Sequence, residues 1–235
     1  MNRNRLRRMM VGVLSGGGGA APLLNGLVAG FAFDGNATDV LGGITLTPSA
    51  SPPTYDTGKV NQAAVFTAAS SQQFSGGNTD LSFGDNSFTL AGWFYLNSAG
   101  GSNYGLLARD NGSAREWLFF WNGGASQLQF RIYNGTSQIG IATAPSPGAA
   151  TWFFAICEYD KAAAKVRLRI NNGAKNEGAV SGTPGVVSVP LIIGGPSAIG
   201  FLAGRTDALY AWNRLLSDAE HVGLWNGGAG TQYPF

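Results

Sequence analysis

A short loop near the start of the chain carries three side chains of the kind that bind hard cations. Asp34, Asn36 and Asp39 place two carboxylates and one amide within the stretch DGNATD. Calcium prefers such oxygen ligands, and calcium-binding loops supply them at close spacing. The same residue types also favour a plain turn, in which Asp and Asn side chains accept hydrogen bonds from nearby main-chain amides. The spacing alone leaves both interpretations open.

The chain contains one cysteine, Cys157, and one histidine, His221. A single cysteine excludes an internal disulfide framework and a metal site built from several thiolates. A nucleophilic thiol would have only His221 as a histidine base. Cys157, however, lies in the apolar run TWFFAICEY, which has the composition of a buried strand. We therefore expect Cys157 to be a buried, unreactive thiol.

Aromatic and basic side chains could form a face that binds a glycan or a protein partner. The candidates for this face are Trp117, Trp121, Arg131, Tyr133, Arg167 and Arg169. In LQFRIY and KVRLRI the basic residues alternate with apolar ones, so the two kinds point to opposite sides of a strand. Arginines suit an anionic glycan or an acidic neighbour. The alternative is an ordinary solvated face of an antiparallel sheet.

Short β-strands must position these residues, because alternating apolar and polar residues recur along the chain. The predicted strands are 27–33, 62–67, 88–96, 104–109, 116–121, 128–133, 138–143, 152–159, 165–170, 191–195 and 207–212. Turn sequences such as NGG, NGT, NNG and SPG separate many of them. The pattern predicts an all-β fold, a two-sheet antiparallel jelly-roll β-sandwich.

One short helix is expected near the C-terminus, at about 217–226. Ser217 is the expected N-cap, and Glu220 follows three residues later, which is the spacing of a capping box. Gly227 and Gly228 are expected to end the helix.

The composition agrees with one large, turn-rich β domain. The 235 residues include 36 glycines, 14 phenylalanines, 7 tyrosines and 6 tryptophans, and only 12% of them are charged. So many aromatic side chains need burial, which excludes a disordered chain. The net charge is +2, and residues 1–8 contribute four arginines and no acidic residue. The remainder is slightly negative, so we do not expect it to bind nucleic acid.

The end of the chain, GRTDALYAWNRLLSDAEHVGLWNGG, resembles the close of laminin-G-like jelly rolls of the concanavalin A-like lectin/glucanase superfamily. That family runs Gly-x-Ile-Asp-Glu-Val, a short strand, then Asn-Arg-x-Leu-Ser-x-x-Glu and an Asn-Gly. The stretches FAFDGNATDVLGG, NQAAVF and NSFTLAGWFY are similar to earlier family segments, in the same order. The resemblance covers residues 27–235 and implies a jelly roll. This fold serves lectins, hydrolase accessory domains, adhesins and virion proteins, so it leaves the function open.

The resemblance also implies a calcium ion at the opening loop, joined by an aspartate of a C-terminal strand, which matches Asp207. The implied ligands are then Asp34, Asn36, Asp39 and Asp207, with calcium as the cofactor. Two departures stand out. VLGG replaces the family's Ser-Gly after the last aspartate of the loop, and Ala208 replaces its glutamate.

Catalysis is not expected. Glucanases of the superfamily carry Glu-x-Asp-x-x-Glu on one strand, because the acid and the nucleophile must flank one bond. The four glutamates here are Glu116, Glu158, Glu177 and Glu220. The nearest approach to the motif is Glu158 with Asp160, and no third carboxylate follows.

The first 22 residues form a separate predicted segment, and residues 23–235 form the domain. Arg3, Arg5, Arg7 and Arg8 precede a short apolar run and four glycines. The apolar run is too short for a secretion signal or a membrane span. We expect a basic assembly arm on a glycine hinge that docks on a neighbouring subunit. A leader or a tail without a role is the alternative.

Two functions remain open at this stage. One is a non-catalytic virion protein of a bacteriophage capsid or tail, multimeric in its assembly, anchored by the arm, exposed on the virion surface and attaching to glycans or host surfaces. The other is a secreted, extracellular bacterial carbohydrate-binding module. The lectin-like jelly roll is common to both.

Overall fold

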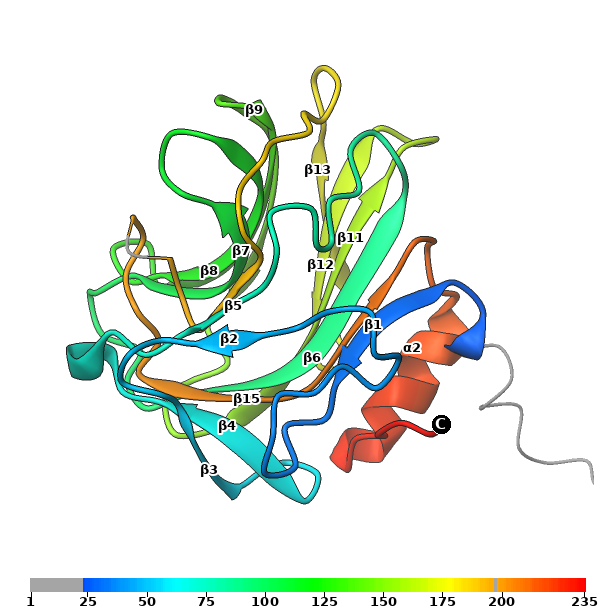
Figure 1. Ribbon diagram of the computed structural model, residues 1–235. Helices are drawn as coiled ribbons and strands as arrows, with labels where there is room; N and C mark the ends of the chain where they lie inside the picture. The colour runs from blue at the N-terminus through cyan, green and yellow to red at the C-terminus, as the bar shows by residue number, and fades with distance from the viewer. Residues whose placement is uncertain (1–22, 197) are drawn as a thin grey trace, which may run out of the picture.

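The computed structural model describes residues 23–196 and 198–235, which form a sandwich of two antiparallel sheets (Figure 1). The order in the first sheet is β13 (Lys175–Ala179), β12 (Lys165–Ile170), β11 (Trp152–Asp160), β6 (Phe88–Leu96), β15 (Gly204–Trp212), β4 (Gln62–Phe66) and β3 (Thr54–Thr57). An eighth strand, β1 (Leu27–Phe31), pairs with β15. The order in the second sheet is β10 (Gln138–Pro145), β9 (Gln127–Gly135), β8 (Arg115–Asn122), β7 (Tyr104–Asp110), β14 (Ile192–Ile193), β5 (Phe74–Ser75) and β2 (Thr47–Pro48). The predicted two-sheet, all-β jelly roll is confirmed.

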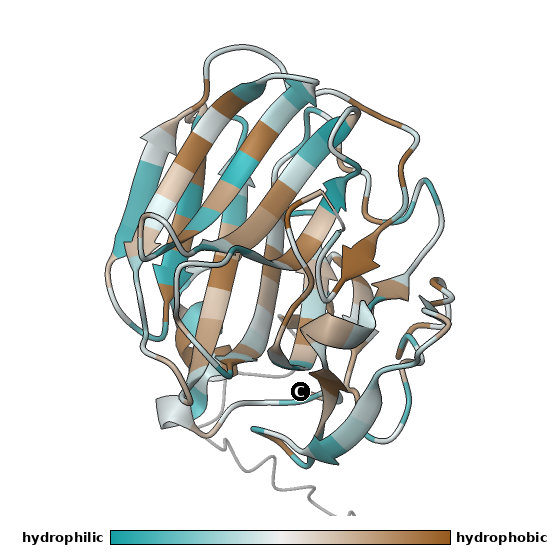
Figure 2. Cartoon of the chain, turned by 90° about the vertical axis from the view of Figure 1, so that its left-hand side faces the viewer, coloured by the Kyte–Doolittle hydropathy of each residue, from teal (hydrophilic) through white to brown (hydrophobic). Residues whose placement is uncertain are grey.

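The alternation of residues along the strands builds the core between the sheets. In β12, Val166 and Leu168 are buried in the core, and Arg167 and Arg169 point to the opposite face. Figure 2 shows the resulting bands of hydrophobic and hydrophilic residues across the strands. Burying the apolar face stabilises the sandwich by about 25 cal/mol per Å² of apolar surface removed from water.

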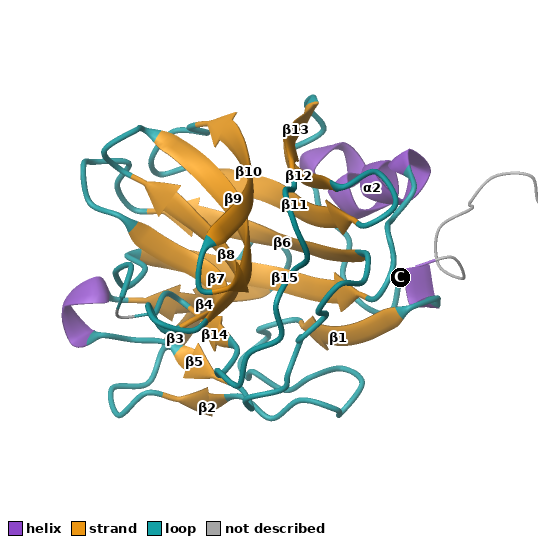
Figure 3. Ribbon diagram, turned by 90° about the horizontal axis from the view of Figure 1, so that it is seen from above, coloured by secondary structure: helices purple, strands orange, loops and turns teal. Residues whose placement is uncertain are grey.

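The C-terminal segment covers the outer face of the first sheet (Figure 3). Its helix, α2 (Asp218–Trp225), begins as expected. The Ser217 side chain accepts from the Glu220 amide at 3.3 Å, and Glu220 Oε2 accepts from the Ser217 amide at 2.8 Å. The helix ends at Asn226, whose φ of 48° is left-handed, just before the two glycines predicted to end it. Trp225 stacks on Trp93 of the sheet, so both faces of the central strands are buried.

Four short strands were not predicted from the sequence: β2, β3, β5 and β13. Their sequences are short, and those of β3 (TYDT) and β13 (KNEGA) are mostly polar. β2, β3 and β13 end the pairing order of their sheets, where one side of the strand has no neighbour. Edge strands are often short and polar, so they carry little of the two-residue periodicity of the central strands.

The described part of the chain contains no helix that is long and apolar enough to cross a membrane.

Candidate functional site

Two members of the predicted aromatic and basic face lie inside the core, which corrects that prediction. Trp117 and Trp121 have no exposed surface. Their indole N–H groups donate to the carbonyl oxygens of Leu81, at 3.1 Å, and Gly100, at 3.2 Å. β8 is apolar on both sides, and its tryptophans occupy the side that faces the other sheet. Neither ring is available to a ligand.

The four remaining members do not form one surface. Arg131 and Tyr133 lie on the outer face of the second sheet, where Arg131 covers the Phe120 ring and Tyr133 is 1% exposed. Arg167 and Arg169 lie on the outer face of the first sheet, on the other side of the sandwich. Sequence periodicity assigned each residue to a side of its own strand. It did not show that the two strands belong to different sheets.

The basic residues of the first sheet already have acidic partners. Arg167 pairs with Asp160 at 2.8 Å and with Glu177 at 2.6 Å. Arg169 contacts Asp218 of α2 at 3.2 Å. This polar face is therefore a network of ion pairs beside the helix, in line with the solvated-face alternative.

Asp39 serves the main chain of the opening loop. Its Oδ1 accepts from the amides of Gly30 and Leu41, at 2.9 and 3.2 Å, and its Oδ2 accepts from those of Gly43 and Ile44, at 2.9 and 3.0 Å. Four main-chain donors occupy the accepting positions that a metal ion would need. Asp39 therefore acts as a residue of an Asx-rich turn and not as a calcium ligand.

Asn36 closes a turn in the same loop. Its side-chain oxygen accepts from the Thr38 amide at 2.9 Å, and its side-chain nitrogen donates to the Asp34 carbonyl at 3.1 Å. It too behaves as a turn residue.

Asp34 and Asp207 come together at the segment 59–62, although they are far apart in the sequence. Asp207 Oδ2 accepts from the amides of Lys59 and Val60, at 2.7 and 2.8 Å. Asp34 Oδ1 accepts from the Gln62 amide at 2.9 Å. Asp207 is fully buried, and its Oδ1 has no hydrogen-bond partner. Burial, together with the nearby Asp34 charge, raises the pKa of Asp207 to about 7.

These two carboxylates fit part of the calcium prediction. A divalent cation would relieve the repulsion between them and would give the unpartnered Asp207 oxygen a ligand. The described residues contain no cluster of three or more His, Cys, Asp or Glu side chains suited to a metal. Amide or carbonyl oxygens and water would therefore have to complete the coordination. Calcium at Asp34 and Asp207 stays a prediction.

Cys157 and His221 lie on opposite sides of the first sheet. Cys157 faces the core, where burial and the charge of Glu158 raise the pKa of its thiol well above the usual value. His221 is a buried residue of α2 on the outer side of the sheet, and its Nε2 is 3.1 Å from Oε1 of Glu158. Glu158 and His221 are both buried. None of these groups can reach a substrate in this arrangement.

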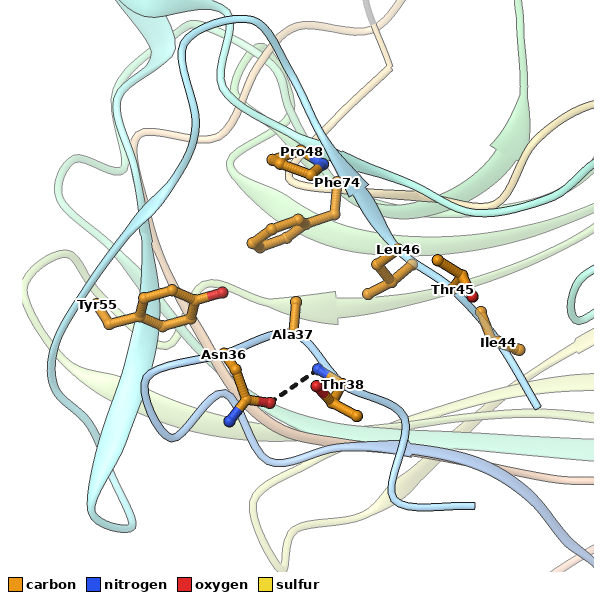
Figure 4. Close-up of a pocket in the computed structure, with 9 residues that line it drawn as sticks. All are labelled: Asn36, Ala37, Thr38, Ile44, Thr45, Leu46, Pro48, Tyr55 and Phe74. Carbon is orange, nitrogen blue, oxygen red and sulfur yellow. Dashed lines mark hydrogen bonds between the residues drawn. The ribbon is translucent and has the colours of Figure 1, made fainter. Parts of the chain in front are cut away.

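A pocket of about 350 Å³ opens between the edge strands β2 and β3. Nine residues line it: Asn36, Ala37, Thr38, Ile44, Thr45, Leu46, Pro48, Tyr55 and Phe74. Figure 4 shows the Tyr55 hydroxyl pointing into the pocket, opposite Leu46 and Thr38. The lining contains no acidic or basic side chain, and burial raises the pKa of Tyr55 further above neutral, so the lining carries no charge at neutral pH.

The pocket was not predicted, because the two strands that frame it, β2 and β3, carry no clear strand signal in the sequence. Of its lining only Asn36 was singled out, and as a metal ligand. The one signal in the sequence is an isolated tyrosine in the polar stretch PPTYDTG. Pockets of this size with a mixed polar and apolar lining commonly bind small molecules.

A family description, the concanavalin A-like lectin/glucanases superfamily, matches residues 51–220. Comparison with curated proteins found no match. Among solved structures, the binding domain of Paraclostridial Mosquitocidal Protein 1 is similar over 88% of this chain and 53% of its own length, with a TM-score of 0.69 and 14% identity. A structure describing cell entry of botulinum neurotoxin type C through two ganglioside molecules gives a TM-score of 0.69 and 10% identity, over 90% of this chain and 53% of the toxin chain.

A third similar structure is domain 4 of AbnA, an extracellular arabinanase from Geobacillus stearothermophilus, in complex with arabinotriose. Its TM-score is 0.56 at 16% identity, over 83% of this chain and 96% of that domain. The chain spans about half the length of the two toxin structures. At these identities the structural likenesses show the fold. The match over residues 51–220 covers most of the chain, which therefore belongs to the concanavalin A-like lectin/glucanase superfamily.

Proposed function

We propose that this protein is a non-catalytic, lectin-like carbohydrate-binding domain, and that the pocket beside Tyr55 binds one uncharged sugar unit. The observation that carries the proposal is the lining of this pocket. An aromatic ring can pack against the C–H face of a sugar, and the amide of Asn36 and the hydroxyls of Thr38 and Thr45 can bond its hydroxyl groups. The absence of charge in the lining favours a neutral sugar.

The comparisons support a binding role without naming a ligand. One similar structure is a complex with arabinotriose, a second is of a toxin whose cell entry is described as dependent on two ganglioside molecules, and a third is a toxin binding domain. The carboxylates closest to a glucanase arrangement, Glu158 and Asp160, are held by His221 and Arg167. The likeness to binding domains and the engagement of these two carboxylates by His221 and Arg167 both favour binding over hydrolysis. A glycan-binding role places the domain outside the cell or on another exposed surface.

A glycan array followed by calorimetry on the glycans that bind tests the proposal. Tyr55→Ala removes the ring and should weaken binding at least tenfold. Tyr104→Ala is the matched control, because Tyr104 is also a half-buried tyrosine of a strand but does not line the pocket. Failure of the wild-type protein to bind any glycan would overturn the proposal. Equal affinity of Tyr55→Ala and the wild type would show that the pocket is not the site.

The virion role is a separate proposal, supported by the sequence of the first 22 residues and by the family resemblance, since virion proteins are among those that use this fold. Arg3, Arg5, Arg7 and Arg8 of the expected assembly arm lie outside the described residues. A chain lacking residues 1–22 should keep the melting temperature and glycan binding of the full chain but fail to join an assembly. Normal incorporation of the shortened chain into particles would refute the arm and favour the secreted carbohydrate-binding module.

A further inference from the structure

A second pocket of about 340 Å³ adjoins the one beside Tyr55. Its lining is Val28, Gly43, Ile44, Thr79, Asp80, Leu81, Ser82, Phe83 and Asn213. Ile44 lines both pockets, so they meet at this side chain. In Figure 4, Ile44 and Tyr55 lie at opposite ends of the first pocket, so the second pocket continues away from Tyr55.

The chemistry of the second pocket differs from that of the first. It contains one carboxylate, Asp80, together with the hydroxyls of Thr79 and Ser82 and the amide of Asn213. Asp80 is half-buried, and its Oδ2 accepts from the Gly77 amide at 2.6 Å. A carboxylate has about four accepting positions, so Asp80 keeps capacity for further donors such as the hydroxyl groups of a sugar.

The main chain on one side of the second pocket is held in place by a buried carboxylate. Asp39, which is 3% exposed, accepts from the amides of Gly43 and Ile44. The main chain at Ile44, the residue shared by the two pockets, is therefore fixed before any ligand binds.

The opposite wall, residues 78–84, is held by a second buried carboxylate and its arginine. Glu116 accepts from the amides of Phe83 and Gly84, at 2.9 and 3.2 Å, and from the Ser82 hydroxyl. Arg109 pairs with Glu116 at 2.9 Å and donates to the carbonyl oxygens of Asn78 and Asp80, at 2.8 and 2.7 Å. Arg109 and Glu116 are 0% and 2% exposed. A wall ordered in advance loses little conformational entropy when a ligand binds.

We propose that the two pockets are consecutive subsites for one oligosaccharide, which crosses Ile44 and places a sugar unit with adjacent hydroxyl groups against Asp80. This inference rests on the proposed function and extends it, because it names the ligand class as a chain of at least two neutral sugar units. A single sugar would occupy only one of the two pockets. The carboxylate of the second pocket selects hydroxyl donors there, and the aromatic ring of the first selects an apolar sugar face.

Calorimetry with arabino-, xylo- and cello-oligosaccharides of one to four units tests the proposal. Affinity for the wild type should rise at least tenfold between one unit and the longest chain of the series that binds. Asp80→Asn keeps an oxygen that can accept the Gly77 amide but removes the charge. It should lower affinity for the longest chain about tenfold and leave the affinity for the single sugar unchanged. Asp85→Asn is the matched control, because Asp85 lies outside both pockets and pairs with Lys161.

The outcomes separate the two proposals. If the wild type binds no oligosaccharide of these series and no glycan of the array, the proposed function fails, and the second subsite fails with it. If the wild type binds one unit as tightly as four, or if Asp80→Asn matches the wild type on the longest chain, the second subsite alone is overturned. Circular dichroism melting of Asp80→Asn confirms that a loss of affinity does not come from unfolding.

Discussion

Removing the Glu116 carboxylate should destabilise the domain more than removing any exposed acidic side chain. In Glu116→Ala the Arg109 guanidinium stays fully buried and keeps only main-chain carbonyl partners. The amides of Phe83 and Gly84 lose their acceptor as well. Breaking a buried ion pair costs about 3–5 kcal/mol, and each unsatisfied buried donor costs about 1–3 kcal/mol in measurements that are not additive. We therefore expect a loss of about 3–5 kcal/mol in the free energy of unfolding.

Urea and thermal unfolding followed by circular dichroism measure this loss. For a domain of this size, about 2–4 °C of melting temperature is lost per kcal/mol, so the midpoint should fall by about 6–20 °C. Glu177→Ala is the control, because Glu177 pairs with Arg167 but its side chain is 38% exposed. An exposed pair contributes about 0–1 kcal/mol. A loss below 1 kcal/mol for Glu116→Ala, or equal losses for the two variants, would refute the reasoning.

Four further predictions concern other buried or capping groups. The pKa of Asp207, raised from 3.8 to about 7, means that the stability contributed by its protonation is complete below pH 4 and is lost as the pH rises through 7. Asp207→Asn should remove this dependence, which is on the order of 4 kcal/mol across that window in pH-dependent urea unfolding. Calcium bound at Asp34 and Asp207 should raise the melting temperature of the wild type, and a chelator should reverse the rise. The melting temperature of Asp207→Asn should not respond to calcium. An unchanged melting temperature of the wild type in calcium would refute the calcium site. Ser217→Ala removes the side-chain N-cap of α2 and should cost about 1 kcal/mol in urea unfolding, whereas an unchanged midpoint would contradict the capping role. The Cys157 thiol should react with a thiol reagent only after unfolding, because it is buried and its pKa is raised; rapid labelling of the native protein would show otherwise.

The central strands, the helix and its cap were predictable because local periodicity and local hydrogen bonds determine them. β12 carries apolar residues at every second position, and β6 and β11 are mostly apolar runs typical of strands buried on both faces. Ser217 and Glu220 cap the helix from three residues apart. The edge strands β2 and β3 were not predictable in this way. Their backbone conformation depends on pairing with β5 and β4, and their side chains carry no clear period.

The sequence by itself determined the fold class, the position of the helix, the burial of Cys157 and the family resemblance. Only the tertiary structure decided which polar side chains act together. Alternation places a residue on one of the two faces of a strand, but it does not show which face meets the other sheet. Trp117 and Trp121 lie on the face that does, in the core. Asp34 and Asp39 are close in sequence, yet one meets Asp207 at segment 59–62 and the other binds main-chain amides. The pockets exist only because segments distant in the sequence come together: the segment around residue 44 lies beside residue 55 in one pocket and beside residue 80 in the other.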